Sequence, residues 1–176
     1  MKNPYYYKGA NPTVDLIVVN PYNEFLLVKR KGNVLACPSQ WAFAGGFINT
    51  NAKSMELWEE GAETPKQAAL REAQEETGLV LENPELMFVG CFEGNNRDPR
   101  DNEESWSKSF VFIYVIDQET YDGQKDNLVG MDDVEEVDWK TINEINELAL
   151  PLAFDHREIL DVALKLLVSK KPTNKM

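Results

Sequence analysis

Hydrophobic and polar residues alternate in blocks that predict a mixed α+β domain. Apolar, β-rich runs at residues 14–19, 25–30 and 41–44 are separated by a turn signal at 21–24 and by a polar loop at 31–40 that contains glycine and proline. The first two runs are close enough in sequence to form a hairpin. The third run stops at a pair of glycines, which permits close backbone approach at that point.

The second half of the chain continues this pattern. Residues 86–92 and 110–116 are predicted to be buried strands, and a last strand is expected to end near Trp139. The polar segment 93–109 and the acidic segment 117–133 are expected to be loops. We therefore expect a single domain of roughly six to eight strands and two or three helices.

The helix at residues 64–78 is the best defined by its sequence. Thr64 and Gln67 have the spacing of a capping box, Pro65 suits the first helical position, and Gly78 is placed to end the helix. Two further helices are expected at about 141–148 and 155–169, the second with an amphipathic apolar stripe.

Three carboxylates share one face of the helix at 64–78. At 100° per residue, Glu75 and Glu76 lie to either side of Glu72, in the last two turns. The carboxyl end of a helix already carries partial negative charge, so this cluster is unfavourable unless it is solvated or meets a cation. A solvated acidic face is one interpretation, and a site for Mg²⁺ or Mn²⁺ is the other, because both ions prefer carboxylate oxygens.

Composition restricts the other possible chemistries. The net charge of −12 argues against general nucleic-acid binding, which needs a basic surface. Cys37 and Cys91 are not part of a Cys-x-x-Cys pair and are expected to be free thiols. His156 is the only histidine, which disfavours a multi-histidine zinc site. Without an apolar run long enough to span a membrane or a signal peptide, the chain is expected to be cytoplasmic.

The chain is divided into three expected parts. Residues 1–12 form a polar lead, 13–170 the domain and 171–176 a tail. Tyr5-Tyr6-Tyr7 in the lead is compatible with an edge strand, a homodimer contact or a simple tail.

Beyond these patterns, the segment from Glu63 to Leu79 resembles the second half of the Nudix box. That motif reads Gly-x5-Glu-x7-Arg-Glu-U-x-Glu-Glu-x-Gly-U, with U an apolar residue, and every fixed residue from Glu63 onward is present. The resemblance implies a Nudix-type α/β/α sandwich with a mixed central sheet and a catalytic loop-helix-loop. It favours the metal site over the solvated face.

The chain departs from the motif at its first glycine. The counterpart is Gly46, 17 positions before Glu63 where the motif has 6, so about 11 residues are inserted, at about 49–60. Surface loops tolerate such changes of length at roughly 0.6 kcal/mol per doubling, so we expect the helix to be retained. The insertion leaves open the path of the loop beside the metal.

The resemblance also implies roles for individual residues. Glu72 and Glu76 would be the principal metal ligands, with Glu75 a third ligand or the base that polarises water. The backbone carbonyl of Gly45 would also ligate the metal, and Arg71 would pair with Glu63 to orient the carboxylates. The general base is left open among several acidic residues: Glu75, Glu93, Asp132, Asp133 and Glu135.

Outer motifs resemble the ADP-ribose pyrophosphatase-like branch of the Nudix hydrolases. They are the segments 41–47, 97–100 and 152–160, together with Trp139. Arg97 and Arg100 are candidates to grip phosphate or ribose oxygens, or are structural. Trp41 and Phe43 are candidates to stack on a base, or are core residues.

The segment around His156 has a structural and a catalytic interpretation. Asp155 and Glu158 have the spacing of a capping pair at the start of the last helix. His156 is interpreted as a structural histidine, with a catalytic role as the alternative.

The predicted function is divalent-metal-dependent hydrolysis of a nucleoside diphosphate linked to another moiety, with ADP-ribose as the preferred substrate. Alternatives are another nucleotide, such as a nucleoside triphosphate, NADH or a sugar nucleotide, and a non-catalytic module that senses ADP-ribose. A regulator in the same branch carries a winged helix after the segment that corresponds to 152–160, whereas here about twenty residues follow and are expected to form one helix. The expected partner is therefore a small nucleotide substrate. No membrane association is expected, and a homodimer is possible.

Overall fold

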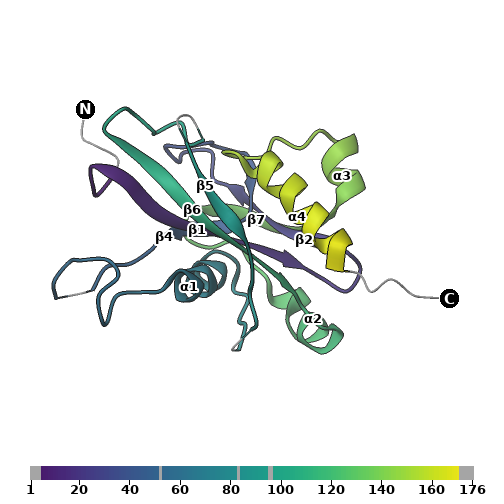
Figure 1. Ribbon diagram of the computed structural model, residues 1–176. Helices are drawn as coiled ribbons and strands as arrows, with labels where there is room; N and C mark the ends of the chain where they lie inside the picture. Colours follow the sequence, from purple (N-terminus) through teal and green to yellow (C-terminus); the bar gives the residue numbers. More distant parts are fainter. Residues whose placement is uncertain (1–4, 52, 83, 95–96, 171–176) are drawn as a thin grey trace.

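A computed structural model describes residues 5–51, 53–82, 84–94 and 97–170, with only the backbone described at residue 170. The structure is a seven-stranded mixed sheet with helices on both faces (Figure 1). The strands are β1 (Gly9–Val19), β2 (Glu24–Arg30), β3 (Trp41–Ala42), β4 (Ala44–Phe47), β5 (Met87–Glu93), β6 (Ser105–Val115) and β7 (Val134–Thr141). The predicted α+β fold with a mixed sheet is confirmed.

The sheet is built around the parallel pair β1 and β6, which runs from Gly9 opposite Ser105 to Val19 opposite Val115. On its other edge β1 pairs with β4 along residues 13–16 and with β2 at its end. The sheet continues from β2 to β3 and β7, and from β6 to β5. Because β4 and β2 share one edge of β1, the short strand β4 is fixed directly beside the middle of β1.

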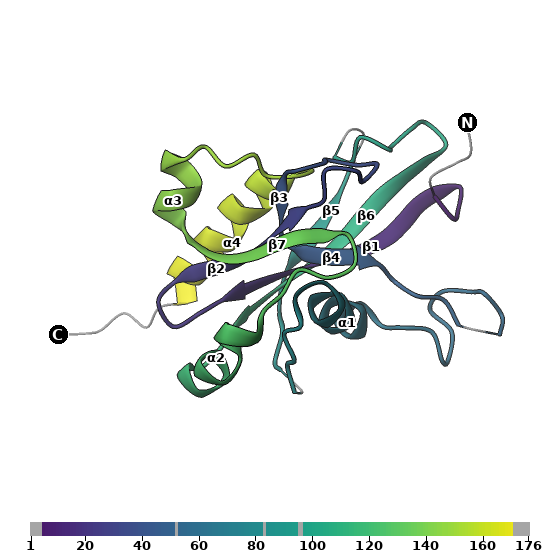
Figure 2. The same ribbon diagram turned by 180° about the vertical axis from the view of Figure 1, so that it is seen from behind.

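The helices cover the two faces of the sheet. Helix α1 (Pro65–Thr77) lies on one face, and α3 (Ile142–Glu147) and α4 (His156–Lys170) lie on the other, as the two opposite views show (Figures 1 and 2). Helix α2 (Gln118–Gln124) and the short 3-10 helix η1 (Lys125–Asn127) follow β6.

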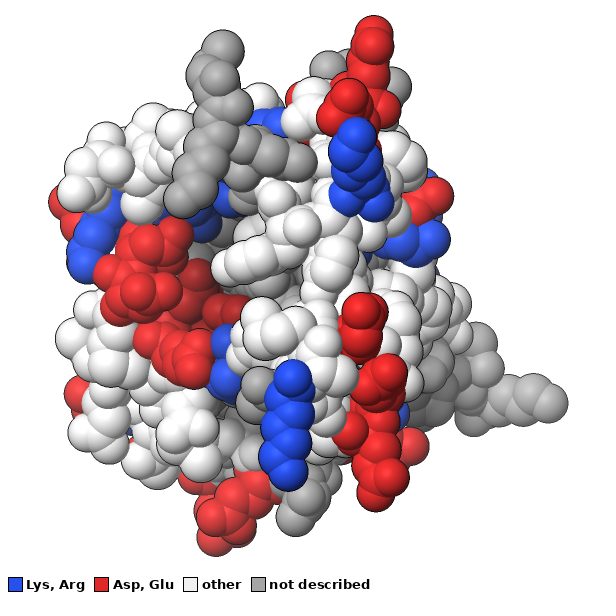
Figure 3. Space-filling model, turned by 90° about the vertical axis from the view of Figure 1, so that its left-hand side faces the viewer, with Lys and Arg blue, Asp and Glu red and all other residues white. Residues whose placement is uncertain are grey.

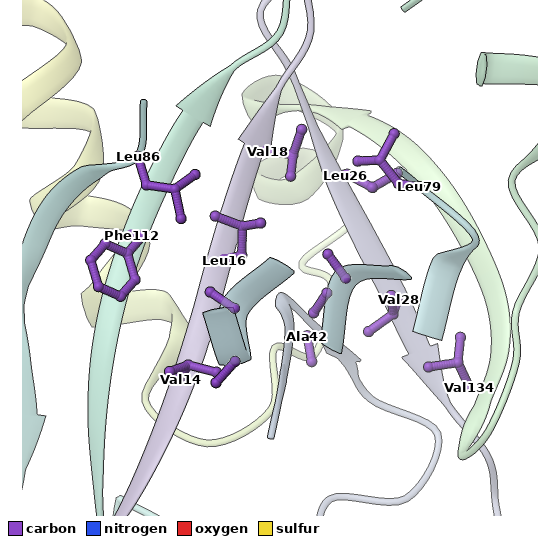
Figure 4. Packing of buried hydrophobic residues seen from close by; sticks show 14 of the residues in the cluster. Val14, Leu16, Val18, Leu26, Val28, Ala42, Leu79, Leu86, Phe112 and Val134 are labelled. Carbon is purple, nitrogen blue, oxygen red and sulfur yellow. The ribbon is translucent and has the colours of Figure 1, made fainter. Parts of the chain in front are cut away.

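Alternation along β1 divides the core into two layers. Val14, Leu16 and Val18 pack in the cluster that includes the buried alanines of α1, whereas Ile17 and Val19 pack in the cluster that includes α4. Figure 4 shows the first layer, in which the side chains of β1 lie between those of β2 and β6. Each layer buries apolar area on folding, which is the main favourable contribution to stability. The sheet therefore holds α1 and α4 on opposite sides of β1.

Three elements differ from the sequence prediction. The run 41–44, expected to stop at the glycine pair, forms β3 and is followed by β4, which contains both glycines because their backbone pairs with β1. Strand β6 begins at Ser105 rather than Phe110, because Ser105, Ser107 and Ser109 are buried on one face at every second position. Serine side chains are small and polar, so this part of the strand has no apolar run in the sequence, although its alternation with a period of two is present. The segment 117–133 was predicted to be a loop, but it contains α2, capped by the Asp117 side chain at Thr120 N–H. Helix α2 has no buried residue, so it has no apolar periodicity.

The ends and the inserted segment are placed as follows. Strand β1 begins at Gly9, inside the expected lead, while the expected tail 171–176 lies outside the described residues. The described part of the insertion, between β4 and α1, contains no helix or strand. Cys37 and Cys91 are free, as predicted. Within the described ranges no helix is both long and apolar enough to cross a membrane.

Candidate active site

The caps of α1 form as its sequence predicts. The Thr64 hydroxyl accepts from Gln67 N–H at 3.3 Å, the Gln67 side chain accepts from Thr64 N–H at 2.9 Å, and Gly78 ends the helix at φ 75°. Ala68, Ala69 and Ala73 are fully buried against the sheet, so small side chains bring the helix close to β1 and β4. This close packing sets the acidic residues of α1 beside the two glycines of β4.

Arg71 connects the acidic residues of α1 to the loop before it. Its Nε and Nη2 donate to the Glu63 carboxylate at 2.8 and 2.9 Å, and Nη1 donates to Glu72 and Glu75 at 2.8 and 2.7 Å. Nη2 also donates to the carbonyl of Phe47 at 2.9 Å. The hydrogen bonds that Arg71 donates to Glu63 are the main cause of a raised pKa for Arg71. The guanidinium therefore holds the loop, the helix and β4 together.

Glu76 is buried at the carboxyl end of α1. Its Oε2 accepts a hydrogen bond from Gly45 N–H at 3.0 Å, and only 4% of the residue is exposed. Burial raises the pKa of Glu76 well above its ordinary value, and the negative charges of Asp133 and Glu72 raise it further against the lowering effect of the Gly45 hydrogen bond. A second, partly buried carboxylate, Glu72, also has a pKa raised by burial. Positive charge in this region would stabilise both ionised forms.

Both glycines of β4 are required by close contacts. A Cβ on Gly46 would lie 2.4 Å from Glu72 Oε1, and one on Gly45 would lie 2.2 Å from the Val14 carbonyl oxygen. A side chain on Gly45 would therefore displace the backbone of β1, whereas a side chain on Gly46 would displace the Glu72 carboxylate.

A cavity of about 320 Å³ lies beside these residues. Its lining combines carboxylates, arginines and aromatic rings from many parts of the chain: Tyr6, Thr13, Val14, Asp15, Arg30, Gly45, Gly46, Phe47, Asn49, Glu72, Glu76, Arg97, Asp98, Arg100, Ser107, Asp132, Asp133 and Phe154. Figure 3 shows acidic side chains gathered around a hollow on this side of the molecule, with basic side chains at its edge. A polar, mixed-charge cavity suits an anionic ligand accompanied by a cation.

The candidate bases are not equally placed. Asp132 and Asp133 line the cavity, and Asp133 pairs with Arg30 at 3.0 Å. Glu75 lines an adjoining hollow that also includes Asp132. Glu93 instead pairs with Lys108 at 2.8 Å, outside the cavity lining, and Glu135 is exposed on β7. The structure thus brings Asp132, Asp133 and Glu75 near the acidic face of α1, but neither Glu93 nor Glu135 into the cavity.

Arg97 and Arg100 both line the cavity and are both paired with acids. Arg97 donates to the Asp155 carboxylate at 3.0 and 2.8 Å, and Arg100 donates to Asp98 from Nε and Nη2. Burial alone would lower the pKa of Arg97, but the carboxylates around it raise that pKa. The carboxylate of Asp155, which was predicted to cap α4, accepts both of these hydrogen bonds from Arg97. Both guanidiniums remain charged beside the cavity.

A buried polar group of three residues lies under the cavity floor. Asp15 accepts from the Ser109 hydroxyl, and its Oδ1 lies 3.2 Å from His156 Nε2. His156 Nδ1 accepts from Phe43 N–H at 3.0 Å, so the proton of a neutral ring is on Nε2, facing Asp15. Burial would raise the pKa of Asp15, but His156, Arg97 and Ser109 together hold that pKa below its ordinary value. His156 is buried and is absent from the cavity lining, in agreement with the structural interpretation.

Trp41 and Phe43 are core residues in this structure. Both are buried in the cluster that packs against α4, Phe43 stacks on His156, and neither ring lines the cavity. The apolar strand sequence that contains them did not reveal which face each ring would occupy. Neither ring is therefore placed to stack on a base in the cavity.

The donors of the site suit a hard divalent cation, although the side chains are not arranged around one. Glu72, Glu76 and Asp133 offer carboxylate oxygens near one another, and burial disfavours the charge of Glu76 more than the Gly45 N–H and the nearby Arg30 favour it. However, Glu72 and Glu75 are turned to Arg71, and in the described parts of the chain no group of three acidic, histidine or cysteine side chains is close enough to hold a metal. Metal binding would require these carboxylates to move closer together.

Several cavity residues were not predicted from the sequence. Asp15 and Ser107 occupy strand positions, and their alternation with apolar residues could have indicated an inward polar face. Arg30 ends a strand and lies 5.3 Å from the Phe154 ring. Its role depends on β2 meeting the segment before α4 in space, for which the sequence carries no local signal.

The comparisons with known proteins agree with this geometry. The NUDIX domain family model matches residues 9–163. An ADP-ribose pyrophosphatase of Methanocaldococcus jannaschii is 33% identical over 145 residues, which cover 81% of this chain and 67% of that protein. An ADPR responsive transcriptional repressor, NtrR, of Acinetobacter baylyi is 27% identical over 93% of this chain and 57% of its own length. The chain thus spans between about half and two thirds of these two curated relatives.

A solved structure supports the fold. The NUDIX domain of Shewanella oneidensis NrtR, determined with ADP ribose, superposes with a TM-score of 0.68 at 23% identity and covers 93% of this chain and 92% of that domain. At that identity the likeness supports the fold alone. The predicted resemblance to the superfamily and to its ADP-ribose pyrophosphatase-like branch is confirmed by the family match and the archaeal relative.

Proposed function

The chain belongs to the Nudix hydrolase family, and from this premise we propose that it hydrolyses the pyrophosphate bond of ADP-ribose, giving AMP and ribose 5-phosphate. The observation that carries the proposal is the cavity in which Glu72 and Glu76 face Arg97 and Arg100. Carboxylates and guanidiniums on the walls of one cavity suit a pyrophosphate that arrives with a divalent cation.

Glu76, Glu72 and the carbonyl of Gly45 would hold Mg²⁺ or Mn²⁺, with Glu75 as a further ligand. When bound, such an ion neutralises phosphate charge and lowers the pKa of water. The Gly45 N–H keeps the Glu76 carboxylate oriented toward β4. Arg71 would hold Glu63 throughout and release Glu72 and Glu75 when the site is loaded, which makes it an orienting residue.

The proton of the attacking water would pass to a carboxylate at the cavity edge. Asp133 pairs with Arg30 at 3.0 Å, and Asp132 lines both the cavity and the hollow that contains Glu75. These three carboxylates are the proposed bases. Glu93 and Glu135 lie outside the cavity lining and are not proposed.

Arg97 and Arg100 would grip phosphate oxygens through their remaining N–H groups. Each is already held by a carboxylate, Asp155 for Arg97 and Asp98 for Arg100, so each guanidinium is fixed before a ligand arrives. Fixed donors stabilise developing negative charge without reorganisation.

A direct assay tests the proposal. The full chain is incubated with ADP-ribose, NADH, a sugar nucleotide and nucleoside triphosphates, with Mg²⁺ or with a chelator, and products are separated by chromatography. We expect AMP and ribose 5-phosphate from ADP-ribose only when the metal is present. Faster turnover of another nucleotide would make that nucleotide the preferred substrate in place of ADP-ribose. No turnover of any of these compounds would contradict the proposal that the protein is a hydrolase.

A sensing module is the second candidate, and the repressor relative favours it. A sensor would bind ADP-ribose tightly without turnover. The complete set of Glu63, Arg71, Glu72, Glu75 and Glu76 favours hydrolysis instead, because binding alone does not require carboxylates buried beside one another.

A further inference from the structure

One wall of the cavity is aromatic and has no part in the bond-breaking chemistry described above. Tyr6 and Phe47 both line the cavity, with ring centroids 5.5 Å apart and perpendicular planes. Tyr6 is 78% exposed although it is a large apolar ring. An exposed ring beside a charged cavity offers a flat surface to a ligand.

Phe47 is held in place on its other sides. The Tyr5 ring packs edge-on against it at 6.2 Å, and the Arg100 guanidinium lies 5.8 Å from its centroid. Tyr5 is itself buried and donates its hydroxyl to Asp101. The Phe47 carbonyl accepts from Arg71, which fixes the backbone of the same residue. The aromatic wall is therefore a built surface whose outer ring alone is exposed.

The position of this wall fits a nucleotide base. Phe47 follows Gly46, which lies close to the Glu72 carboxylate, and Arg100 lies over the rings of Tyr5 and Phe47 and also lines the cavity. A ligand with phosphates between the carboxylates and arginines would extend a planar group toward Tyr6 and Phe47. The rings of every base stack on aromatic side chains.

We propose that Tyr6 and Phe47 form a stacking site for the base of the nucleotide substrate, a purine in the case of ADP-ribose. The inference rests on the proposed function and names its specificity-determining residues. Trp41 and Phe43, which the sequence suggested for this role, are replaced by a residue before β1 and by the last residue of β4.

Binding of AMP by the full chain with Mg²⁺ tests the stacking site without any bond cleavage. Tyr6→Ala should weaken AMP binding by between about 5-fold and 100-fold, the range expected for one lost stacking contact. Tyr6→Phe should restore it, and inorganic pyrophosphate, which has no base, should bind equally to all three proteins. Quenching of the fluorescent analogue etheno-AMP should be lost in Tyr6→Ala.

Tyr22→Ala is the matched control, because Tyr22 is also an exposed tyrosine, at 59%, but lies outside the cavity lining. Unchanged AMP binding by Tyr6→Ala, an equal loss for pyrophosphate, or no AMP binding by the parent chain would each overturn the stacking site. So would a change of oligomeric state in Tyr6→Ala with AMP binding intact, because Tyr6 would then belong to a contact between copies.

The two proposals fail separately. If ADP-ribose is not hydrolysed but AMP binding depends on Tyr6, the stacking site stands and the hydrolase proposal falls. If ADP-ribose is hydrolysed with Mg²⁺ but Tyr6→Ala binds AMP as tightly as the parent chain, the hydrolase proposal stands and the stacking site falls.

Discussion

The carboxylate of Glu76 accepts a hydrogen bond from the backbone N–H of Gly45, which joins the end of α1 to the strand beside the cavity. The contact connects residues 31 positions apart and keeps a buried charge in a fixed direction. The Gly45 N–H and the charge of Arg30 do not offset burial and the charges of Asp133 and Glu72, and a cation would therefore stabilise the Glu76 carboxylate.

Replacing Glu76 by glutamine should separate activity from stability. Glutamine keeps an oxygen for Gly45 N–H but removes the charge, so the metal loses a principal ligand and kcat should fall by roughly 100-fold or more. The free energy of unfolding without metal should not fall, because a buried carboxylate near Asp133 and Glu72 is removed. Steady-state kinetics and urea unfolding measure the two effects.

Glu135→Gln is the control for this change, because Glu135 is exposed and outside the cavity lining. It should leave both quantities as they are. Near-normal kcat for Glu76→Gln would remove Glu76 from the metal site.

Arg71→Lys tests whether the guanidinium fork is needed. A lysine ammonium cannot bond Glu63, Glu72 and the Phe47 carbonyl at once, as Arg71 does. Because the Arg71 side chain is only a quarter exposed, we expect a loss of about 1–3 kcal/mol in the free energy of unfolding. We also expect a smaller stabilisation of the folded protein by Mg²⁺. Thermal denaturation with and without Mg²⁺ measures both.

Arg157→Lys is the comparison for Arg71→Lys, since Arg157 makes one hydrogen bond to the Asn146 side chain and one to a backbone carbonyl. A loss of stability as large as in Arg71→Lys would show that the cost is general for arginine. The role of Arg71 in joining loop, helix and strand would then be unsupported.

Shortening the inserted loop should leave the catalytic helix intact. The contacts that fix the loop to the site come from its ends, where Glu63 Oε2 accepts from Asn49 N–H at 3.0 Å and Glu63 N–H donates to the Asn49 carbonyl at 3.1 Å. No described residue between Thr50 and Ala62 lines the cavity. A deletion of residues 51–60 that keeps Asn49 and Glu63 should therefore retain metal-dependent hydrolysis, measured as kcat/KM for ADP-ribose. A folded variant, checked by circular dichroism, with no activity would assign the loop to the site.

The sequence predicted what depends on local periodicity and on the motif. The caps of α1 and the Arg71–Glu63 pair follow from fixed spacings, and both are present. The aromatic residues could not be assigned in the same way. Phe43 and Phe47 are four positions apart with a pair of glycines between them, yet the first packs against His156 and the second lines the cavity. That difference is set by the pairing of β4 with β1 and by the helix on each face, which are tertiary contacts.

Asp15 gives a pH dependence whose direction is fixed by its surroundings. Its pKa in the folded protein lies below the unfolded value of about 3.9, because His156, Arg97 and Ser109 stabilise the carboxylate more than burial destabilises it. A lowered pKa means that the unfolded chain binds more protons than the folded one in this range. The stability contributed by the Asp15 charge is therefore complete above about pH 4 and is lost as the pH falls toward the folded pKa.

Asp15→Asn should accordingly be less stable than the parent chain at pH 7, and the difference should shrink as the pH falls below about 4. Asparagine keeps the size of the side chain, so the change reports the charge that faces Arg97 and His156. Urea unfolding at a series of pH values measures the difference, with Asp161→Asn on the exposed side of α4 as the control. A difference that grows toward acid would mean that the folded pKa of Asp15 is raised, and that burial outweighs its three partners.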